Sequence, residues 1–197
     1  MIRRQLINFQ NRSVDVRVGL GAFDELPRMF ASAVGKPKRA MVVWNSASSE
    51  RFDEVVEHAL VDAGFAVSQF SLEVSPAGAT LADADAIFGA LSANGITCDD
   101  LVVAVGDAAI CSVVSWCANQ WCGRTECALL PTTFDAMLTV ATTMKSLVAS
   151  SANALPARRT PRTSSSAMWY LLAPCFRAVS PAGISLLRPS PRFSRAR

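Results

Sequence analysis

The sequence predicts an α/β fold in which a Rossmann-like parallel sheet carries helices on both faces, with an irregular basic C-terminal tail. Short apolar runs typical of buried strands, such as Arg39 to Trp44 and Leu101 to Val105, alternate with segments of helical periodicity. This alternation is typical of parallel sheets with helical crossovers. The tail is predicted from composition, because residues 150–197 contain eight arginines and no lysine, aspartate, glutamate or histidine.

The individual elements follow from local patterns. Period-two alternation over 13–19 predicts a strand that can form a hairpin with 4–9, and helical spacing predicts a helix over 23–34. Thr80, with Asp83 three residues later, predicts the N-cap of a helix over 80–93. The other predicted elements are strands over 39–44, 66–72, 101–105 and 127–130 and helices over 50–63, 108–119 and 134–144.

Charge divides the chain into two parts. Residues 1–149 carry 11 basic and 16 acidic residues, a net charge of −5, whereas residues 150–197 carry a net charge of +8. We therefore expect a globular domain over 1–149 and a disordered or out-of-frame tail over 150–197. The absence of Lys, Asp, Glu and His favours out-of-frame translation of the tail. The alternative is a basic arm for nucleic acid or an acidic surface, although no recognition motif or interleaved aromatic residues support it.

Several classes of protein are disfavoured. The N-terminus lacks the apolar core of a secretory signal, and the most apolar stretch, Leu101 to Cys117, is broken by Gly106 and Asp107. We expect a cytoplasmic protein without a membrane partner. Six cysteines without a C-x-x-C pair and a single histidine, His58, disfavour a zinc site. The cysteines are expected to be buried or half-buried thiols, and His58, Trp116 and Trp121 to be structural.

In this fold class a ligand binds beyond the carboxyl ends of the strands, where helix N-termini can hold phosphate groups. The candidate loops are 45–48, 74–79, 106–109 and 131–134. Three of these loops also have a purely structural interpretation. Asn45 can be a turn residue, Asp107 a helix N-cap, and Thr132 with Thr133 a simple helix start.

The segment LVVAVGDAAICSVVSWCA, followed by CALLPTTFDAML and Lys145, resembles the N-terminal half of the 3-dehydroquinate synthase family. The resemblance covers about residues 13–146. It implies a nucleotide-binding domain that family members join to a helical metal domain, and it implies a homodimer. The family uses NAD and a divalent metal to convert a phosphorylated seven-carbon sugar acid into 3-dehydroquinate. This carbon–oxygen lyase reaction belongs to the shikimate pathway of aromatic amino acid biosynthesis.

The resemblance also implies roles for individual residues. Lys145 is the candidate catalytic residue through contact with the substrate, although it can equally be a solvated cation at a helix end. The candidate cofactor-binding residues are Asn45, Gly78, Gly106, Asp107, Thr132 and Thr133.

The departures from the family pattern are as informative as the matches. Asp107 replaces a glycine, Ser112 an acid, and Thr139 an aspartate, while Ala79 and Ala82 replace a Glu and a Lys. The family's metal ligands, a Glu and two His, have no counterpart in 150–197. We therefore expect a truncated pseudoenzyme that is inactive alone. The alternatives are a non-catalytic module that binds a nucleotide or a protein, and a nucleic-acid binder that uses the basic tail.

Overall fold

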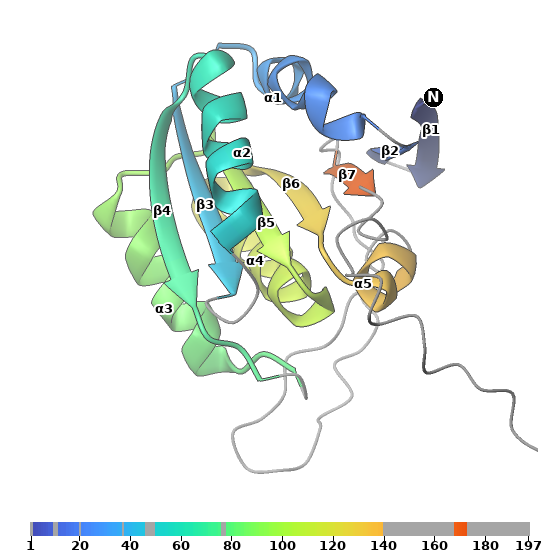
Figure 1. Ribbon diagram of the computed structural model, residues 1–197. Helices are drawn as coiled ribbons and strands as arrows, with labels where there is room; N and C mark the ends of the chain where they lie inside the picture. The colour runs from blue at the N-terminus through green and yellow to red at the C-terminus, as the bar shows by residue number, and fades with distance from the viewer. Residues whose placement is uncertain are drawn as a thin grey trace, which may run out of the picture.

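The computed structural model describes residues 2–9, 12–19, 21–36, 38–45, 50–75, 78–139 and 168–172 (Figure 1). The strands are β1 (Ile2–Phe9), β2 (Arg12–Gly19), β3 (Arg39–Asn45), β4 (Ala66–Leu72), β5 (Leu101–Gly106), β6 (Glu126–Pro131) and β7 (Met168–Leu172). The α-helices are α1 (Leu26–Ala33), α2 (Glu50–Asp62), α3 (Leu81–Ala93), α4 (Ala108–Gln120) and α5 (Phe134–Thr139). Short 3-10 helices span Ala22–Glu25 and Trp121–Gly123.

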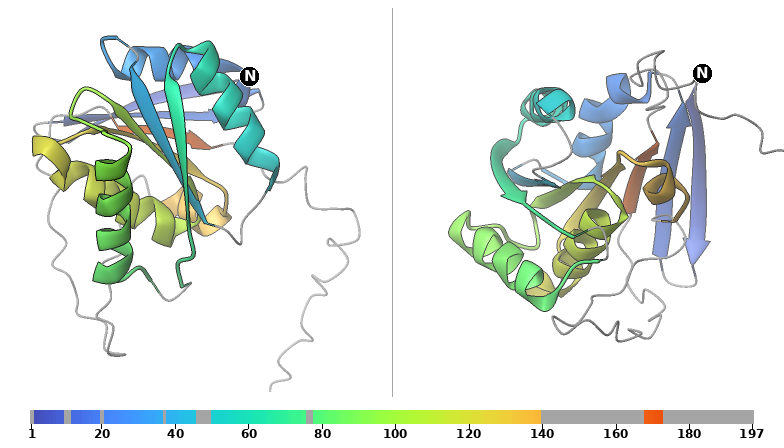
Figure 2. Two further views of the ribbon diagram at one scale, coloured as in Figure 1. Left: turned by 90° about the vertical axis from the view of Figure 1, so that its left-hand side faces the viewer. Right: turned by 60° about the horizontal axis from the view of Figure 1, so that its bottom comes forward.

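One sheet contains all seven described strands, in the order β1-β2-β7-β6-β5-β3-β4. The strands β2, β7, β6, β5, β3 and β4 pair in parallel, and β1 closes the edge antiparallel to β2. Figure 2 shows the β1–β2 hairpin at one side of the sheet with β7 beside it. The predicted parallel sheet and the predicted hairpin are confirmed.

Alternate residues of the central strands build two separate cores, one on each face. Val42 and Val103 pack on the face that α1 and α2 cover, with Phe30 and Leu60 from those helices. Met41 and Val102 point to the other face, where they meet α3, α4 and α5. All six residues of β5 are buried, as expected for a strand covered on both faces. The sheet therefore has helices on both faces, as predicted.

Helix α3 begins where the sequence places its N-cap. The Thr80 hydroxyl accepts the Asp83 amide, and the Asp83 carboxylate accepts the Thr80 amide at 2.6 Å, which completes a capping box. The predicted helix over 23–34 begins with a 3-10 turn at Ala22–Glu25 and continues as α1. The predicted helix over 134–144 is α5 as far as Thr139, and residues 140–144 lie outside the described residues.

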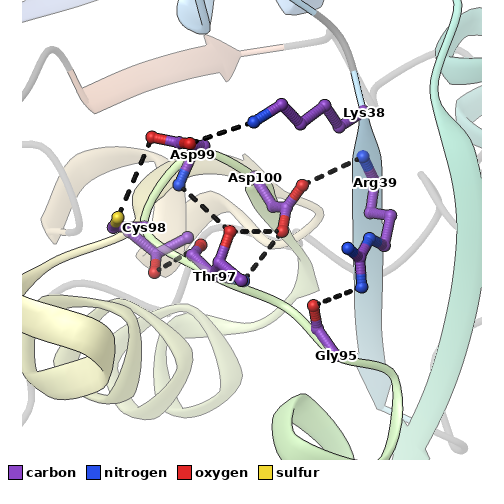
Figure 3. Close-up of polar contacts among 8 residues, drawn as sticks. Lys38, Arg39, Gly95, Thr97, Cys98, Asp99 and Asp100 are labelled. Atoms are coloured by element: carbon purple, nitrogen blue, oxygen red, sulfur yellow. Dashed lines mark hydrogen bonds and ion pairs between the residues drawn. The ribbon is translucent and has the colours of Figure 1, made fainter.

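A polar cluster joins β3 and β5 at their amino ends (Figure 3). The buried Asp100 carboxylate accepts the Arg39 amide at 3.1 Å and both the amide and the hydroxyl of Thr97 at 2.8 Å. Lys38 pairs with Asp99 at 3.0 Å, and the Arg39 guanidinium donates to the Gly95 carbonyl. This cluster fixes the edge of the sheet opposite to the predicted ligand loops, so it serves the fold.

The tail requires one correction. Residues 150–197 were expected to be irregular, yet Met168–Leu172 form β7, which pairs with β2 on one side and β6 on the other. The short apolar run MWYLL supplies a strand to the interior of the sheet. The rest of the tail lies outside the described residues, and the expectation of an out-of-frame origin stays a prediction. Among the described residues, no helix is long and apolar enough to cross a membrane.

Candidate functional site

The candidate site lies where the direction of winding of the sheet reverses. From β3 the chain passes through α2 to β4 at one edge, whereas from β5 it passes through α4 to β6 on the other side. β3 and β5 are neighbours, and Trp44 is in register with Val105. Ligands of open α/β sheets bind outside the carboxyl ends of strands at such a reversal. Asn45, which ends β3, and Gly106, which ends β5, therefore flank this point.

The end of β6 joins the same row. Gly106 is in register with Pro131, and the Thr132 amide donates to the Gly106 carbonyl at 2.8 Å. The Thr132 hydroxyl oxygen is buried and has no hydrogen-bond partner within the described part of the chain. Thr133 caps α5, since its hydroxyl accepts the Ala136 amide at 3.3 Å. The two threonines therefore have different roles. Thr133 caps α5, and the Thr132 hydroxyl forms no hydrogen bond among the described residues.

The segment between β4 and α3 also reaches this region. Val74 and Ala79 belong to the same buried cluster as Ala108 and Ala109 at the start of α4. Gly78 lies between them with φ of +137°, a backbone conformation that favours glycine, and its amide donates to the Ser75 carbonyl at 2.9 Å. Gly78 is therefore needed for the turn that brings this loop against the N-terminal end of α4.

Gly106 is required by its conformation and by the close approach of α4. Its φ is +152°, and a Cβ atom at this position would lie 3.2 Å from Ile110 Cγ2. The absence of a side chain therefore lets the first turn of α4 pack directly on the end of β5.

Asp107 is the N-cap of α4. Its Oδ1 accepts the Ala109 amide at 2.8 Å and the Ile110 amide at 3.0 Å. A carboxylate in this place is stabilised by the partial positive charge of the helix N-terminus. Of the two interpretations that the sequence left open, the structure shows the cap. Sequence reasoning did not single out the amides of Ala109 and Ile110, although an aspartate directly before a helix predicts that they are engaged.

The other positions that depart from the family pattern are occupied structurally. The buried Ser112 hydroxyl donates to the Ala108 carbonyl within α4. The Thr139 hydroxyl donates to the Asp135 carbonyl at 2.7 Å. Ala79 is buried, and Ala82 is exposed on α3. Both hydroxyls thus donate to the backbone of their own helices, and neither supplies the negative charge of the acid that the family pattern has at its position. Lys145 lies outside the described residues, and its predicted role stays a prediction.

The remaining candidates lie elsewhere. His58 Nδ1 is 2.8 Å from the Glu54 carbonyl oxygen of its own helix. Trp116 and Trp121 pack against Phe88, with ring centroids 6.0 and 5.8 Å from it. These contacts fit the structural roles expected for the three residues. The described residues contain no group of three His, Cys, Asp or Glu side chains that could hold a metal ion.

The cysteines depart in part from expectation. Cys111, Cys117 and Cys127 are buried free thiols, as predicted, but Cys98 and Cys122 are free and exposed. Burial raises the pKa of the Cys117 thiol to about 12, and burial raises the pKa of Cys111 as well. Cys98 lies in the connection between α3 and β5, and Cys122 lies in the short 3-10 helix between α4 and β6. Cys175 lies outside the described residues.

The fold is that of a Rossmann-like α/β domain, and solved structures of other proteins share it. The sequence matches no protein-family model and no curated protein. Two structures of 2-deoxy-scyllo-inosose synthase are similar, with TM-scores of 0.72 and 0.69 at 14% identity, and one is a complex with carbaglucose-6-phosphate, NAD+ and Co2+. The valiolone synthase ValA from Streptomyces hygroscopicus subsp. jinggangensis 5008, solved with NAD+ and Zn2+, has a TM-score of 0.65 at 18% identity.

The alignments cover 86% of this chain for the inosose synthase and 89% for ValA, but only 46% and 47% of those chains. The present chain thus spans about half the length of these proteins. At such low identity the comparison shows a shared fold.

The residues at the carboxyl edge fit a dinucleotide only in part. The row formed by Asn45, Gly106 and Thr132 lies at the place where this fold class binds ligands, and the buried Thr132 hydroxyl has no hydrogen-bond partner among the described residues. The diphosphate is the exception, because the Asp107 carboxylate already accepts the α4 amides that this group would use. The site as built therefore does not fit the diphosphate of NAD.

Proposed function

We propose that this chain is a 3-dehydroquinate synthase-like protein that corresponds to the nucleotide-binding half of a sugar phosphate cyclase and does not catalyse the cyclisation alone. The observation that carries the proposal is the alignment of the ends of β3, β5 and β6 at the winding reversal, in a fold shared with two NAD+-bound cyclases. We further propose a cytoplasmic homodimer whose full-length relatives perform a lyase step of the shikimate pathway. These last points rest on the resemblance in the sequence.

The residue types at the candidate site support the proposal that this chain does not catalyse the cyclisation. A phosphate-eliminating cyclisation that uses a divalent metal needs ligands for the ion, and His58, the only histidine in the sequence, interacts with its own helix backbone. The four loops at the carboxyl edge, 45–48, 74–79, 106–109 and 131–134, contain no lysine or arginine that could neutralise a substrate phosphate. They contain one acid, Asp107.

A turnover assay tests the proposal directly. Purified chain 1–197 is incubated with the phosphorylated seven-carbon sugar acid, NAD+ and Co2+ or Zn2+, and inorganic phosphate release is followed. An active 3-dehydroquinate synthase serves as the positive control. We expect no phosphate release above the blank. Sustained release that scales with the concentration of the chain would refute the inactive state.

Sequencing of the gene over codons 140–200, read in all three frames, tests the proposed origin of the chain. A frame that continues with acidic residues, a Glu and two spaced His would support descent from a complete two-domain synthase. If no frame continues in this way, the descent from a metal-dependent enzyme loses its support, and a binding module becomes the better description.

A second candidate function is a non-catalytic module that binds a protein. It is favoured by α5, where the large apolar side chains of Phe134 and Leu138 are 61% and 59% exposed beside the end of β6. Light scattering of the purified chain tests this candidate. Self-association that the Phe134→Asp variant abolishes would support it, whereas a monodisperse monomer in both proteins would count against self-association through α5.

A further inference from the structure

The amides at the beginning of α4 are already bound to an anion of the chain itself. A single oxygen, Asp107 Oδ1, accepts both the Ala109 and the Ile110 amides. The next amide, that of Cys111, donates to the Asp107 carbonyl at 3.0 Å and belongs to the regular helix. Two donors of the first turn are thus directed at one carboxylate oxygen, at the helix terminus where an external anion would bind.

These amides are the ones that a dinucleotide needs in a sheet wound in this way. α4 follows β5, one of the two strands at the winding reversal, and in dinucleotide-binding domains the diphosphate lies at the N-terminus of a helix that follows such a strand. The conditions for close approach are otherwise met, because Gly106 lacks a side chain and packs on Ile110. The carboxylate of Asp107 is therefore the specific feature that opposes a diphosphate.

The negative charge of Asp107 also opposes diphosphate binding, in addition to the hydrogen bonds that its carboxylate already accepts from the amides of α4. A diphosphate brought to this turn would lie within a few ångströms of a like charge, and like charges repel more strongly at a protein surface than in bulk water. The loops at this edge of the sheet offer no lysine or arginine of their own to offset that repulsion. Displacement of the carboxylate would also remove the N-cap of α4.

We infer that Asp107 is a specificity-determining residue that stands in for a phosphate group at the N-terminus of α4 and excludes diphosphate-containing ligands from it. This inference rests on the proposed function, since it identifies which part of the expected dinucleotide the site has lost. The ligand class that remains for the carboxyl edge is a nucleoside or another uncharged molecule of that kind. Asn45 and Thr132 are two polar residues that lie at this edge.

The test is a calorimetric titration of full-length wild-type, Asp107→Gly and Asp107→Asn chains with ADP and with adenosine. Asp107→Gly removes the carboxylate and exposes the amides. Asp107→Asn keeps an oxygen that can cap α4 and removes only the charge, so it covers the case in which the glycine variant does not fold. Asp99→Asn removes one negative charge at the opposite edge and controls for net charge. Circular dichroism establishes that each chain is folded.

We expect ADP to bind at least tenfold more tightly to Asp107→Gly than to the wild-type chain, with a smaller gain for Asp107→Asn and none for Asp99→Asn. Adenosine affinity should not change among the four proteins. The inference is overturned if Asp107→Gly and Asp107→Asn bind ADP no better than the wild type, or if adenosine gains as much as ADP. The proposed function fails separately, through phosphate release by the wild-type chain in the turnover assay.

Discussion

The backbone amide of Thr132 donates to the carbonyl oxygen of Gly106 at 2.8 Å, which extends the pairing of β5 and β6 by one residue beyond the end of β6. This hydrogen bond holds the segment Pro131-Thr132-Thr133 against the turn that begins α4. As a result, the buried Thr132 hydroxyl and the Asp107 carboxylate belong to adjacent loops of one edge. The geometry of the candidate site is therefore set by main-chain pairing, and a change in the turn at Gly106 should affect the whole edge.

The first prediction concerns Gly106. Substitution by alanine should lower the free energy of unfolding by about 1–3 kcal/mol, because the backbone conformation disfavours a side chain and the new Cβ would crowd Ile110. Chemical unfolding followed by circular dichroism measures the difference. The matched control is Gly89→Ala in α3, where a Cβ meets no atom within 4 Å. That change should stabilise the chain by about 0.5–1 kcal/mol. Equal effects of the two substitutions would contradict the assigned role of Gly106.

The second prediction concerns Asp100. Its carboxylate is buried and accepts three hydrogen bonds from Arg39 and Thr97, so Asp100→Ala leaves buried donors without partners. We expect a loss of about 1–3 kcal/mol in the free energy of unfolding, measured by urea titration. The neighbouring Asp99 forms an exposed ion pair with Lys38, and Asp99→Asn should have little effect. A larger loss from Asp99→Asn than from Asp100→Ala would show that the cluster in Figure 3 is misassigned.

The elements that the sequence predicted well are those whose signals are local. β3 and β5 are continuous apolar runs, and α3 begins at a capping box formed by residues three positions apart. β7 was missed because its partners are distant: Val16 and Leu129 both pair with Tyr170. The hydrophobic pattern within Met168–Leu172 does not indicate which strands it pairs with. The surrounding sequence is rich in arginine and proline, which is typical of irregular structure.

The sequence predicted where the candidate site lies in the fold. It did not predict which hydrogen bonds the Asp107 side chain forms there. Parallel strands and their order along the chain placed Asn45, Gly106 and Thr132 at one edge. The sequence alone did not decide whether Asp107 faces a ligand or caps its own helix, because both roles use the same residue type before the same helix. The distances from Oδ1 to the Ala109 and Ile110 amides show that Asp107 caps α4, and its role toward a cofactor stays a prediction.

The third prediction concerns thiol reactivity. At pH 8 iodoacetamide should modify Cys98 and Cys122 quickly in the folded chain, because both are exposed. Cys111 and Cys117 should react at least about tenfold more slowly, since burial blocks the reagent and a raised pKa leaves less of the reactive thiolate at this pH. Peptide mapping by mass spectrometry gives the rate at each site, and labelling in urea provides the fully accessible reference. Rapid labelling of Cys117 without urea would contradict the packing of α4.

The last prediction concerns β7 as the link between the hairpin and the rest of the sheet. β2 pairs only with β1 and β7 among the described strands, so the hydrogen-bonded ladder from the hairpin to β6 passes through residues 168–172. Tyr170→Pro removes an amide at the centre of this strand and should disrupt both of its ladders. Hydrogen exchange measured by mass spectrometry should then show at least about a tenfold loss of protection over 12–19, or about 1.4 kcal/mol.

The control for this prediction is Ala178→Pro, which places the same residue type in the tail outside β7. It should leave the protection of β2 unchanged, and neither variant should alter exchange in β3 and β4, which lie on the far side of β5. Unchanged protection of β2 in Tyr170→Pro would show that the tail does not contribute a strand in solution. A selective loss would instead show that a segment with the composition of an out-of-frame product has become part of the hydrogen-bonded sheet, because parallel pairing requires backbone groups and tolerates many side chains.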